Sequence, residues 1–357
     1  MRFRFWSPLA HNSPIKKPST ARRSPAPGSH AHTDVRLGRI VRLLVNHATV
    51  IVSGTKIAEE IGTSRSEVWR LIEQLRELGV EIEGHPATGY GLKSVPDLLL
   101  PDMLLPLLKG TLFDQPVHHY YKIDSTNSAA MEAAASGAPE GTVVLGEQQT
   151  AGRGRAGHRW DSQNSAGIYC SVILRPALPP SDALLLSLAA GLAVYDAIRG
   201  IDSRVLPDLK WPNDLLIQGK KFCGILTEMN AEVTRVRHLV VGIGINVNQS
   251  SFPAELQTLA TSLRLVSGSE WSRVEVCAAL LKSLDREYRD LLGKPRARES
   301  ILERFQERSS SARGQRVTVE ENGGFEGVTE GLDARGFLRV RTSQGIRTVL
   351  SGTVRAK

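Results

Sequence analysis

Cysteine and long apolar runs are both scarce in this chain. Only three cysteines, Cys170, Cys223 and Cys277, occur in 357 residues, and no CxxC spacing is present. Three well-separated cysteines indicate neither a disulfide framework nor a zinc ribbon. The longest apolar run, 183–195, has 13 residues, whereas a membrane-spanning helix needs about 20. We interpret this run as a buried helix and expect no membrane segment.

Acidic residues are absent from residues 1–33, which carry six Lys and Arg residues and five prolines. The whole chain has 45 Lys and Arg against 37 Asp and Glu, a net charge of +8. Residues 34–357 therefore keep 39 basic against 37 acidic residues, or +2. Without apolar periodicity, residues 1–33 are expected to be disordered, either as an extension without function or as a basic arm that assists DNA binding. A secretory signal core is also missing, which favours a cytoplasmic protein.

Residues 34–97 are predicted to form a winged helix-turn-helix, the first of the two or three domains that the chain length suggests. Helical apolar spacing predicts one helix at the start of this segment and another over 65–78. Ser53 and Gly62 are the expected cap and end of a short helix between them. Alternation over 80–93 around a Pro/Gly turn predicts a β-hairpin wing. This order of elements is typical of DNA-binding domains.

The third predicted helix presents polar and aromatic residues outward. Its two arginines are candidates for contacts with phosphates or guanine edges, although a tryptophan stands where a small polar base-reading residue is more usual. Residues 34–97 carry eight basic and nine acidic residues, and a net charge of −1 lacks the basic excess of a strong DNA binder. A dimerisation or regulatory domain that touches no DNA is therefore the alternative. The candidate DNA-binding residues are Arg65, Ser66, Trp69 and Arg70.

Two further segments follow this domain, with predicted bounds 98–312 and 313–357. They begin with an apolar connector at 98–108, in which the prolines favour a hinge-like linker over a long helix. The last segment has alternating apolar residues and turns at Asn322-Gly323 and Arg335-Gly336, as short antiparallel strands would.

A glycine-rich loop with two arginines follows the predicted strand at 142–149. Gly152, Gly154 and Gly157 satisfy GxGxxG, but a dinucleotide-binding fold needs a helix that opens at the glycines. The polar sequence HRWDSQNSAG follows instead. Glycine backbone amides can converge on an anion, and guanidinium groups pair with carboxylate or phosphate, so we interpret the loop as one that wraps an anionic ligand. A surface loop with solvated arginines is the alternative.

Polar and basic residues occur at the ends of other predicted elements. Ser125, Thr126 and Asn127 precede an Ala-rich helix, where they can cap the helix or bind a polar ligand. Lys210 precedes Trp211-Pro212 at a strand end, and its compact charge can meet both a carboxylate and a phosphate.

These motifs together make the chain similar to the biotin–protein ligases, of the bacterial kind that also acts as a biotin operon repressor. The resemblance covers roughly residues 34–357. It rests on STN at 125–127, GRGRAGHRW at 152–160, KWPNDLLIQGKKFCGILTE at 210–228 and GIGIN at 242–246. It implies an α+β fold with a winged helix-turn-helix, a central mixed sheet with flanking helices, and a small SH3-like β-barrel, which GLDARGFLRV at 331–340 resembles.

The resemblance also implies a two-step reaction. Biotin and ATP, with Mg²⁺ on the phosphates, give biotinyl-5′-AMP, and a lysine of the biotin carboxyl carrier protein of acetyl-CoA carboxylase then takes the biotin. Operator DNA and a ligand-dependent homodimer are the further implied partners. The roles it implies are biotin binding for Ser125, Thr126, Asn127, Gln149, Arg153, Gly154, Arg155 and Lys210, nucleotide binding for Gly152, Gly157, Trp160 and Asn246, and catalysis for Arg153, Arg155 and Lys210, with no metal-ligating residue.

Three alternatives stay open at this point. The first is a ligase whose front domain no longer binds DNA. The second is a lipoate-type ligase, which activates another acid by adenylation. The third is a ligand-sensing regulator without catalysis, although Arg153, Arg155 and Lys210 argue against it.

Overall fold

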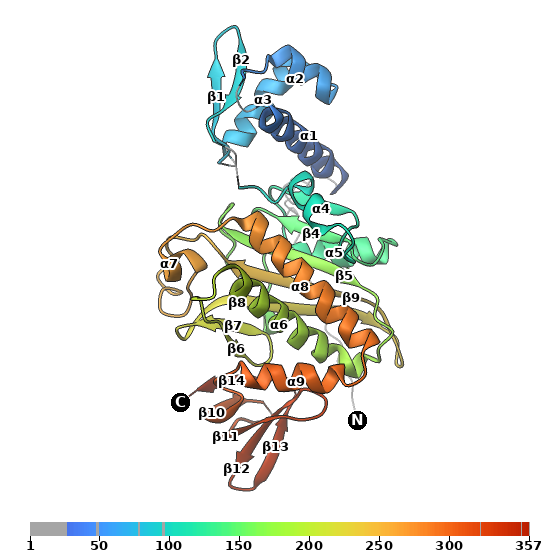
Figure 1. The fold of residues 1–357 in the computed structure, drawn as a ribbon, viewed down its shortest axis with the longest axis vertical. Helices are drawn as coiled ribbons and strands as arrows, with labels where there is room; N and C mark the ends of the chain where they lie inside the picture. Colours follow the sequence, from blue (N-terminus) through green and yellow to red (C-terminus); the bar gives the residue numbers. More distant parts are fainter. Residues whose placement is uncertain are drawn as a thin grey trace, which may run out of the picture.

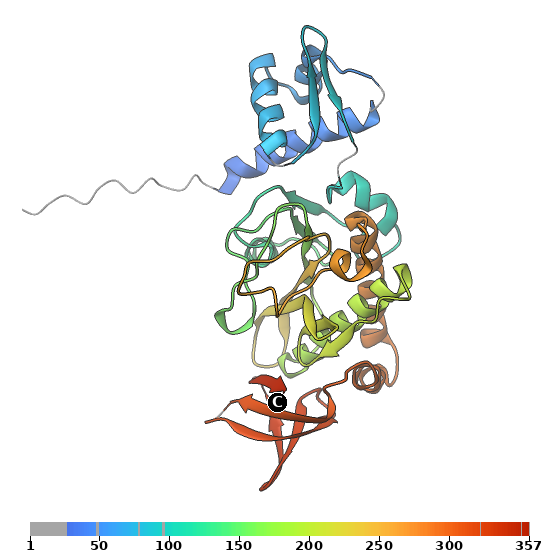
Figure 2. The same ribbon diagram turned by 90° about the vertical axis from the view of Figure 1, so that its left-hand side faces the viewer.

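The computed structural model describes residues 27–47, 50–77, 79–94, 97–321, 323–350 and 352–356. Three parts follow one another along the long axis in chain order: a helical part with a hairpin, a central sheet with helices, and a C-terminal sheet (Figures 1 and 2). The predicted α+β class is confirmed. The expected disorder of residues 1–26 lies outside the described residues.

The N-terminal part has the predicted winged helix-turn-helix order. Ser53 caps the second helix by accepting a hydrogen bond from the Lys56 amide, and Gly62 ends that helix in the left-handed conformation, as the sequence predicts. Val52 pairs with Tyr90 and so ties the wing to the helix-turn-helix. The elements are α1 (Pro27–Asn46), α2 (Gly54–Ile61), α3 (Arg65–Glu77), β1 (Ile82–His85) and β2 (Gly89–Leu92).

Helix α1 begins earlier than the sequence predicts. It starts at Pro27 rather than at Asp34, so the expectation of disorder is wrong for residues 27–33. Proline suits the first helical position, because its φ is already helical and no intrahelical acceptor exists for an amide there.

The connector is partly helical, which corrects the predicted hinge-like linker. Helix α4 (Pro101–Leu108) begins with one proline at its first position and tolerates Pro106 inside. Burial explains this outcome, because Leu104 and Leu108 are fully buried in the central core and tertiary packing outweighs the weak propensity of so short a helix.

The central part is built on a seven-stranded mixed sheet in the order β3-β4-β5-β9-β8-β7-β6. Strands β3 and β4 are parallel, and every other neighbouring pair is antiparallel. The strands are β3 (Val117–Tyr120), β4 (Val143–Gly146), β5 (Gly167–Leu174), β6 (Asp208–Lys210), β7 (Asp214–Ile217), β8 (Lys220–Ala231) and β9 (Val236–Asn246).

Helices cover both faces of this sheet (Figure 1). Residues such as Val143 and Val172 face a core shared with α6 and α8, whereas their neighbours Val144 and Ile173 pack against α5. Successive residues of these strands point to opposite faces of the sheet, so the same strands contribute apolar side chains to two cores. The helices of this part are α5 (Thr126–Ala135), α6 (Ala183–Ile201), α7 (Leu263–Ser267), α8 (Arg273–Gly293) and α9 (Ala297–Glu307).

Helix α6 carries the long apolar run. Together with the preceding turn, Pro180–Ile201 is the one described helix long and apolar enough to cross a membrane, and 67% of its apolar window is buried inside the protein. Twelve of its residues are buried in the core, as expected for the central helix of a globular domain.

The C-terminal part is a five-stranded antiparallel sheet in the order β13-β12-β11-β10-β14. Trp211 docks it onto the central part by donating a hydrogen bond of 2.9 Å to the Gly336 carbonyl. The predicted small β domain is confirmed, and its closure as an SH3-like barrel stays a prediction. The strands are β10 (Arg313–Glu320), β11 (Phe325–Leu332), β12 (Leu338–Thr342), β13 (Gly345–Val349) and β14 (Thr353–Ala356).

Candidate active site

A cavity lies on the face of the central sheet that carries α5. Three glycines of β8 and β9 form its floor, and the glycine loop and the start of α5 form its walls. The lining residues are Ser125, Thr126, Asn127, Gln149, Arg153, Gly154, Arg155, Trp160, Tyr169, Asn213, Lys221, Gly224, Ile225, Leu226, Gly242, Ile243 and Gly244. Most of the residues predicted to bind biotin therefore lie together.

The indole of Trp160 rests on two of the floor glycines, which are Cα partners on neighbouring strands. A Cβ on Gly244 would lie 2.6 Å from Trp160 Cε2, and a Cβ on Gly224 would lie 2.8 Å from Trp160 Cζ3. Only glycine permits this approach. The indole Nε1 is buried and has no hydrogen-bond partner in the described part of the chain, so this donor is left for a ligand or a water molecule.

The start of α5 is joined to the sheet by a network of polar side chains. Ser125 caps the helix by accepting a hydrogen bond from the Ser128 amide. The Thr126 amide donates to Gln149 Oε1 over 2.9 Å. The hydroxyl of Ser171 contacts Thr126 Oγ1 at 2.8 Å and Asn127 Oδ1 at 2.6 Å. These contacts fix polar groups at one end of the cavity. Ser125 both caps α5 and lines the cavity, and Thr126 and Asn127 line it as well.

Glu228 extends this network to the glycine loop. Its Oε2 accepts from Asn127 Nδ2 and from Arg153 Nη2, each over 2.8 Å. Asn127 also lies against Gly242, where a Cβ would come within 1.9 Å of its Oδ1. Glu228 ends the KWPND-containing motif at 210–228, and no local pattern in the sequence marks it as a site residue.

The glycine loop contains no α-helix. After the 3₁₀ turn Arg155–Gly157 the chain returns, and the Gly154 amide donates to the His158 carbonyl over 2.7 Å. Gly152 is packed so tightly that a Cβ would lie 2.7 Å from the Trp160 carbonyl oxygen. Gly152 and Gly157, predicted to bind nucleotide, line a second, outer cavity that shares Arg153, Gly154 and Arg155 with the first.

Arg155 lies between the loop and the sheet. Its Nη1 donates to Asn213 Oδ1 over 3.2 Å. Burial lowers the pKa of its guanidinium, and the nearby carboxylate of Asp214 works in the opposite direction. An arginine stays charged under both influences, so the cavity keeps a partly desolvated cation.

Lys221, and not Lys210, is the lysine that lines the cavity. Its Nζ lies 2.7 Å from Asp214 Oδ1 and 5.3 Å from the centre of the Trp160 ring. Lys210 lies on the edge strand β6, where its Cα partner is Asp214. Lys210 is outside the cavity lining, although it lies on the same face of the sheet, in register with Asp214 and Gly224. Its predicted role in the pocket stays a prediction.

A β-bulge turns Lys221 toward the cavity. Leu215 pairs with Cys223 but Leu216 pairs with Lys221, so Phe222 is an extra residue in β8. Phe222 and Cys223 are both fully buried in the core. Strict alternation would place Lys221 on the opposite face from Gly224, and the extra residue reverses that assignment.

Asn246, predicted to bind nucleotide, is outside the cavity lining. It is 5% exposed, donates to the Thr261 carbonyl over 3.1 Å and accepts from Gln249 Nε2 over 3.2 Å. Its side chain orders the segment after β9, and its predicted role at the nucleotide stays a prediction.

The predicted DNA-binding face of α3 is solvent-accessible. Trp69 is 59% exposed, a high value for so large an apolar side chain. Arg70 forms a two-pronged contact with Glu67 at 2.6 and 2.9 Å, which neutralises part of the charge expected to reach DNA. Arg65 and Ser66 lie at the start of the same helix, where Ser66 Oγ is 2.9 Å from Ser64 Oγ.

The mixed sheet, the glycine loop with its two arginines and the helix-turn-helix in front define a ligase with a DNA-binding module. Family models agree in each part: residues 36–91 match the HTH domain, residues 120–246 match the biotin/lipoate A/B protein ligase family, and residues 313–355 match the biotin protein ligase C terminal domain.

Relatives match along most of the chain. The bifunctional ligase/repressor BirA of Bacillus subtilis (strain 168) is 37% identical over 88% of this chain and 97% of its own length. The corresponding protein of Bacillus spizizenii is 39% identical over the same shares. The solved biotin protein ligase from Aquifex aeolicus in complex with biotin and ATP is 31% identical, with a TM-score of 0.60 over 68% of this chain and 99% of that chain. The chain belongs to the biotin protein ligase family.

Proposed function

We propose that this protein activates biotin with ATP and transfers it to a lysine of a biotin carboxyl carrier protein, and that its front domain binds DNA as a biotin-responsive repressor. One observation carries the ligase assignment. Arg153, Arg155 and Lys221 meet at one cavity, beside the fixed polar groups of the α5 start, which suits a ligand with a polar head and a carboxylate.

The chemistry needs charge and position more than a protein nucleophile. A carboxylate oxygen of biotin attacks the α-phosphorus of ATP, the bond from that phosphorus to the bridging oxygen breaks, and pyrophosphate leaves. The amine of the carrier lysine then attacks the acyl carbon, AMP leaves, and the amine loses a proton. Cations at the α-phosphate stabilise the charge that develops in the first step. We assign this role to Arg153, Arg155 and Lys221.

The remaining predicted residues divide between the two substrates. Ser125, Thr126, Asn127 and Gln149 would hold the polar ring of biotin, because their mutual hydrogen bonds fix donors and acceptors at the α5 end. Trp160 and the outer cavity with Gly152 and Gly157 would hold the nucleotide. Ordering of the glycine loop over the intermediate would exclude water from the mixed anhydride.

Mg²⁺ fits this site as a companion of ATP. Within the described ranges, no group of three His, Cys, Asp or Glu side chains could hold a metal ion. Magnesium in such sites takes most of its ligands from substrate phosphates and water, with one or two carboxylates. Asp214, which already contacts Lys221, is the carboxylate that we expect nearest to those phosphates.

DNA binding is assigned to α3 and the wing, with Arg65, Ser66, Trp69 and Arg70 as the contacting residues. Exposure of Trp69 supports apolar contact with base edges such as a thymine methyl group. A ligand-dependent homodimer and a cytoplasmic location remain part of the proposal.

Incubation with ATP, Mg²⁺, radiolabelled biotin and a biotin carrier domain tests the ligase. Label on the carrier lysine is the expected result. Adenylate without transfer would indicate a ligand sensor, and labelling with lipoate but not biotin would overturn the substrate. A gel shift with an operator fragment, with and without biotin and ATP, tests the repressor function separately.

A further inference from the structure

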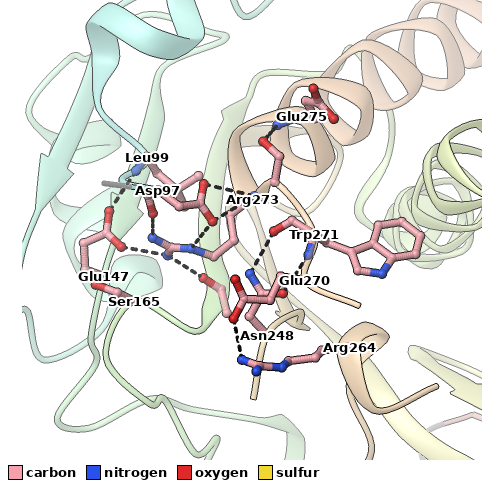
Figure 3. A network of polar contacts seen from close by, with 12 residues as sticks. Asp97, Leu99, Glu147, Ser165, Asn248, Arg264, Glu270, Trp271, Arg273 and Glu275 are labelled. Carbon is pink, nitrogen blue, oxygen red and sulfur yellow. Dashed lines mark hydrogen bonds and ion pairs between the residues drawn. The ribbon is translucent and has the colours of Figure 1, made fainter. Parts of the chain in front are cut away.

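Arg273, the first residue of α8, lies at a junction between the pocket strands and the connector. Its side chain is fully buried. One guanidinium nitrogen, Nη1, donates to Glu147 Oε2 over 2.7 Å and to the Gly167 carbonyl over 3.0 Å. Its Nε donates to Asp97 Oδ2 over 3.2 Å, and Nη2 donates to the Asp97 carbonyl. Figure 3 shows Asp97 and Glu147 converging on the guanidinium of Arg273.

Glu147 completes the junction from the pocket side. It is fully buried, and its Oε1 accepts from the Leu99 amide and from His119 Nε2, each over 2.9 Å. Burial alone would raise the pKa of Glu147, but the charge of Arg273 and these hydrogen bonds more than offset it and lower the pKa to about 2. A buried carboxylate and a buried guanidinium that satisfy each other allow little freedom of position.

The connector is packed into both of the neighbouring cores. Leu98 and Leu100 are buried in the N-terminal cluster, together with Tyr121 of the central part. Leu99, between them, is buried in the central core. Alternate residues of one short segment thus hold the DNA-binding part against the central part, and Asp97 is the residue through which this segment meets Arg273.

The other side of the junction leads directly to the cavity. Glu147 follows β4, and Gln149, two residues later, accepts from the Thr126 amide in the cavity wall. Gly167 begins β5, two residues before Tyr169, which also lines the cavity. Arg273 therefore contacts Glu147 and Gly167, each two residues from a cavity-lining position, and also contacts Asp97 of the connector.

We propose that Arg273 is a positioning residue that couples the ligand cavity to the DNA-binding domain, with Asp97 as its connector-side partner. A ligand that fixes Gln149 and Tyr169 fixes Glu147 and Gly167, and Arg273 passes this restraint to Asp97 and so to the placement of the winged helix. The inference rests on the proposed repressor function for its biological role, but its physical content is a restraint on the connector that biotinyl-AMP strengthens.

Asp97→Ala is the variant that tests this coupling. Asp97 is 38% exposed, so its removal should leave the protein folded, and it touches no cavity residue. Asp102→Ala is the matched control, because Asp102 forms an exposed ion pair of 3.3 Å with Arg42 across the same domain boundary. Exposed pairs of this kind contribute little.

Hydrogen exchange of a peptide covering residues 97–104 gives the decisive measurement. In the wild type and in Asp102→Ala, biotinyl-AMP should slow exchange of this peptide severalfold. In Asp97→Ala the slowing should be lost, while adenylation and carrier labelling stay within about twofold. Equal slowing in Asp97→Ala and the wild type, or no slowing in the wild type, would overturn the proposal.

Gel shifts supply the second readout. The gain in operator affinity on adding biotinyl-AMP should fall at least about fivefold in Asp97→Ala, the lower end of typical coupling between two sites, and should persist in Asp102→Ala. An unchanged gain in Asp97→Ala would contradict the coupling. A wild type that shows ligand-dependent exchange but never binds DNA would refute the repressor function and leave the coupling standing.

Discussion

Replacing Lys221 by methionine should remove most of the adenylation activity. The ammonium lies in the cavity wall, 2.7 Å from Asp214 and 34% exposed, where a ligand phosphate would meet it. Two unit charges about 4 Å apart interact by about 4 kcal/mol at an effective dielectric constant of about 20, and partial exposure reduces this. Loss of one preorganised charge at a reacting centre costs on the order of 10²–10³ in rate. Biotin-dependent exchange of pyrophosphate into ATP measures this first step.

Lys210→Met is the matched control for that experiment. It removes the same charge from the same sequence motif, but from the edge strand β6, outside the cavity lining. We expect its exchange rate to stay within about threefold of the wild type, because Lys210 is outside the cavity lining. Equal losses in the two variants, or a larger loss in Lys210→Met, would refute the assignment of Lys221.

Three further predictions follow from the cavity and the buried carboxylate. Gly244→Ala should displace Trp160, because the new Cβ would lie 2.6 Å from its ring, and a raised KM for ATP with a nearly unchanged unfolding midpoint would support this. Arg155→Gly should release biotinyl-AMP and label lysines indiscriminately, and unchanged selectivity for the carrier lysine would defeat the idea. Glu147 has its pKa lowered from 4.5 to about 2, so its stabilising contribution, about 3 kcal/mol, is present above pH 4.5 and is lost as the pH falls toward 2. Urea unfolding between pH 6 and pH 3 should show this loss, and Glu147→Gln should flatten it.

Local signals in the sequence predicted the features that depend on a few neighbouring residues. Ser53 and Gly62 mark the ends of α2, and Ser125 marks the start of α5, because capping is decided by the cap residue and the adjacent amides. The polar sequence after Gly157 excluded a Rossmann helix, and only a 3₁₀ turn is present there. The three-part organisation follows from such signals together with the family resemblance.

Features that depend on strand register and on strand order in the sheet could not be predicted from the sequence. Alternation along β8 does not identify Phe222 as the extra residue, and yet this bulge decides that Lys221 faces the cavity. A lysine before Trp-Pro predicts a rigid strand end, and Lys210 does end β6, but the position of β6 at the sheet edge could not be read from spacing. The sequence does contain one sign of the bulge. Lys220 and Lys221 at the start of β8 are followed by two successive apolar residues, Phe222 and Cys223, which breaks the alternation expected of a strand.

Two of the three cations of the site already have a carboxylate partner in the chain. Arg153 pairs with Glu228 at 2.8 Å, and Lys221 pairs with Asp214 at 2.7 Å. Three neighbouring cations in a half-buried cavity would otherwise repel one another and lower the stability of the fold. A ligand carboxylate or phosphate must therefore replace Glu228 or Asp214 as the partner of these cations. The binding free energy then gains only the difference between the cation's interaction with the ligand and its interaction with the displaced carboxylate. This exchange explains how a site for two anionic substrates can exist although residues 34–357 carry a net charge of only +2. Because the site has little net positive charge of its own, Mg²⁺ would offset part of the negative charge of ATP.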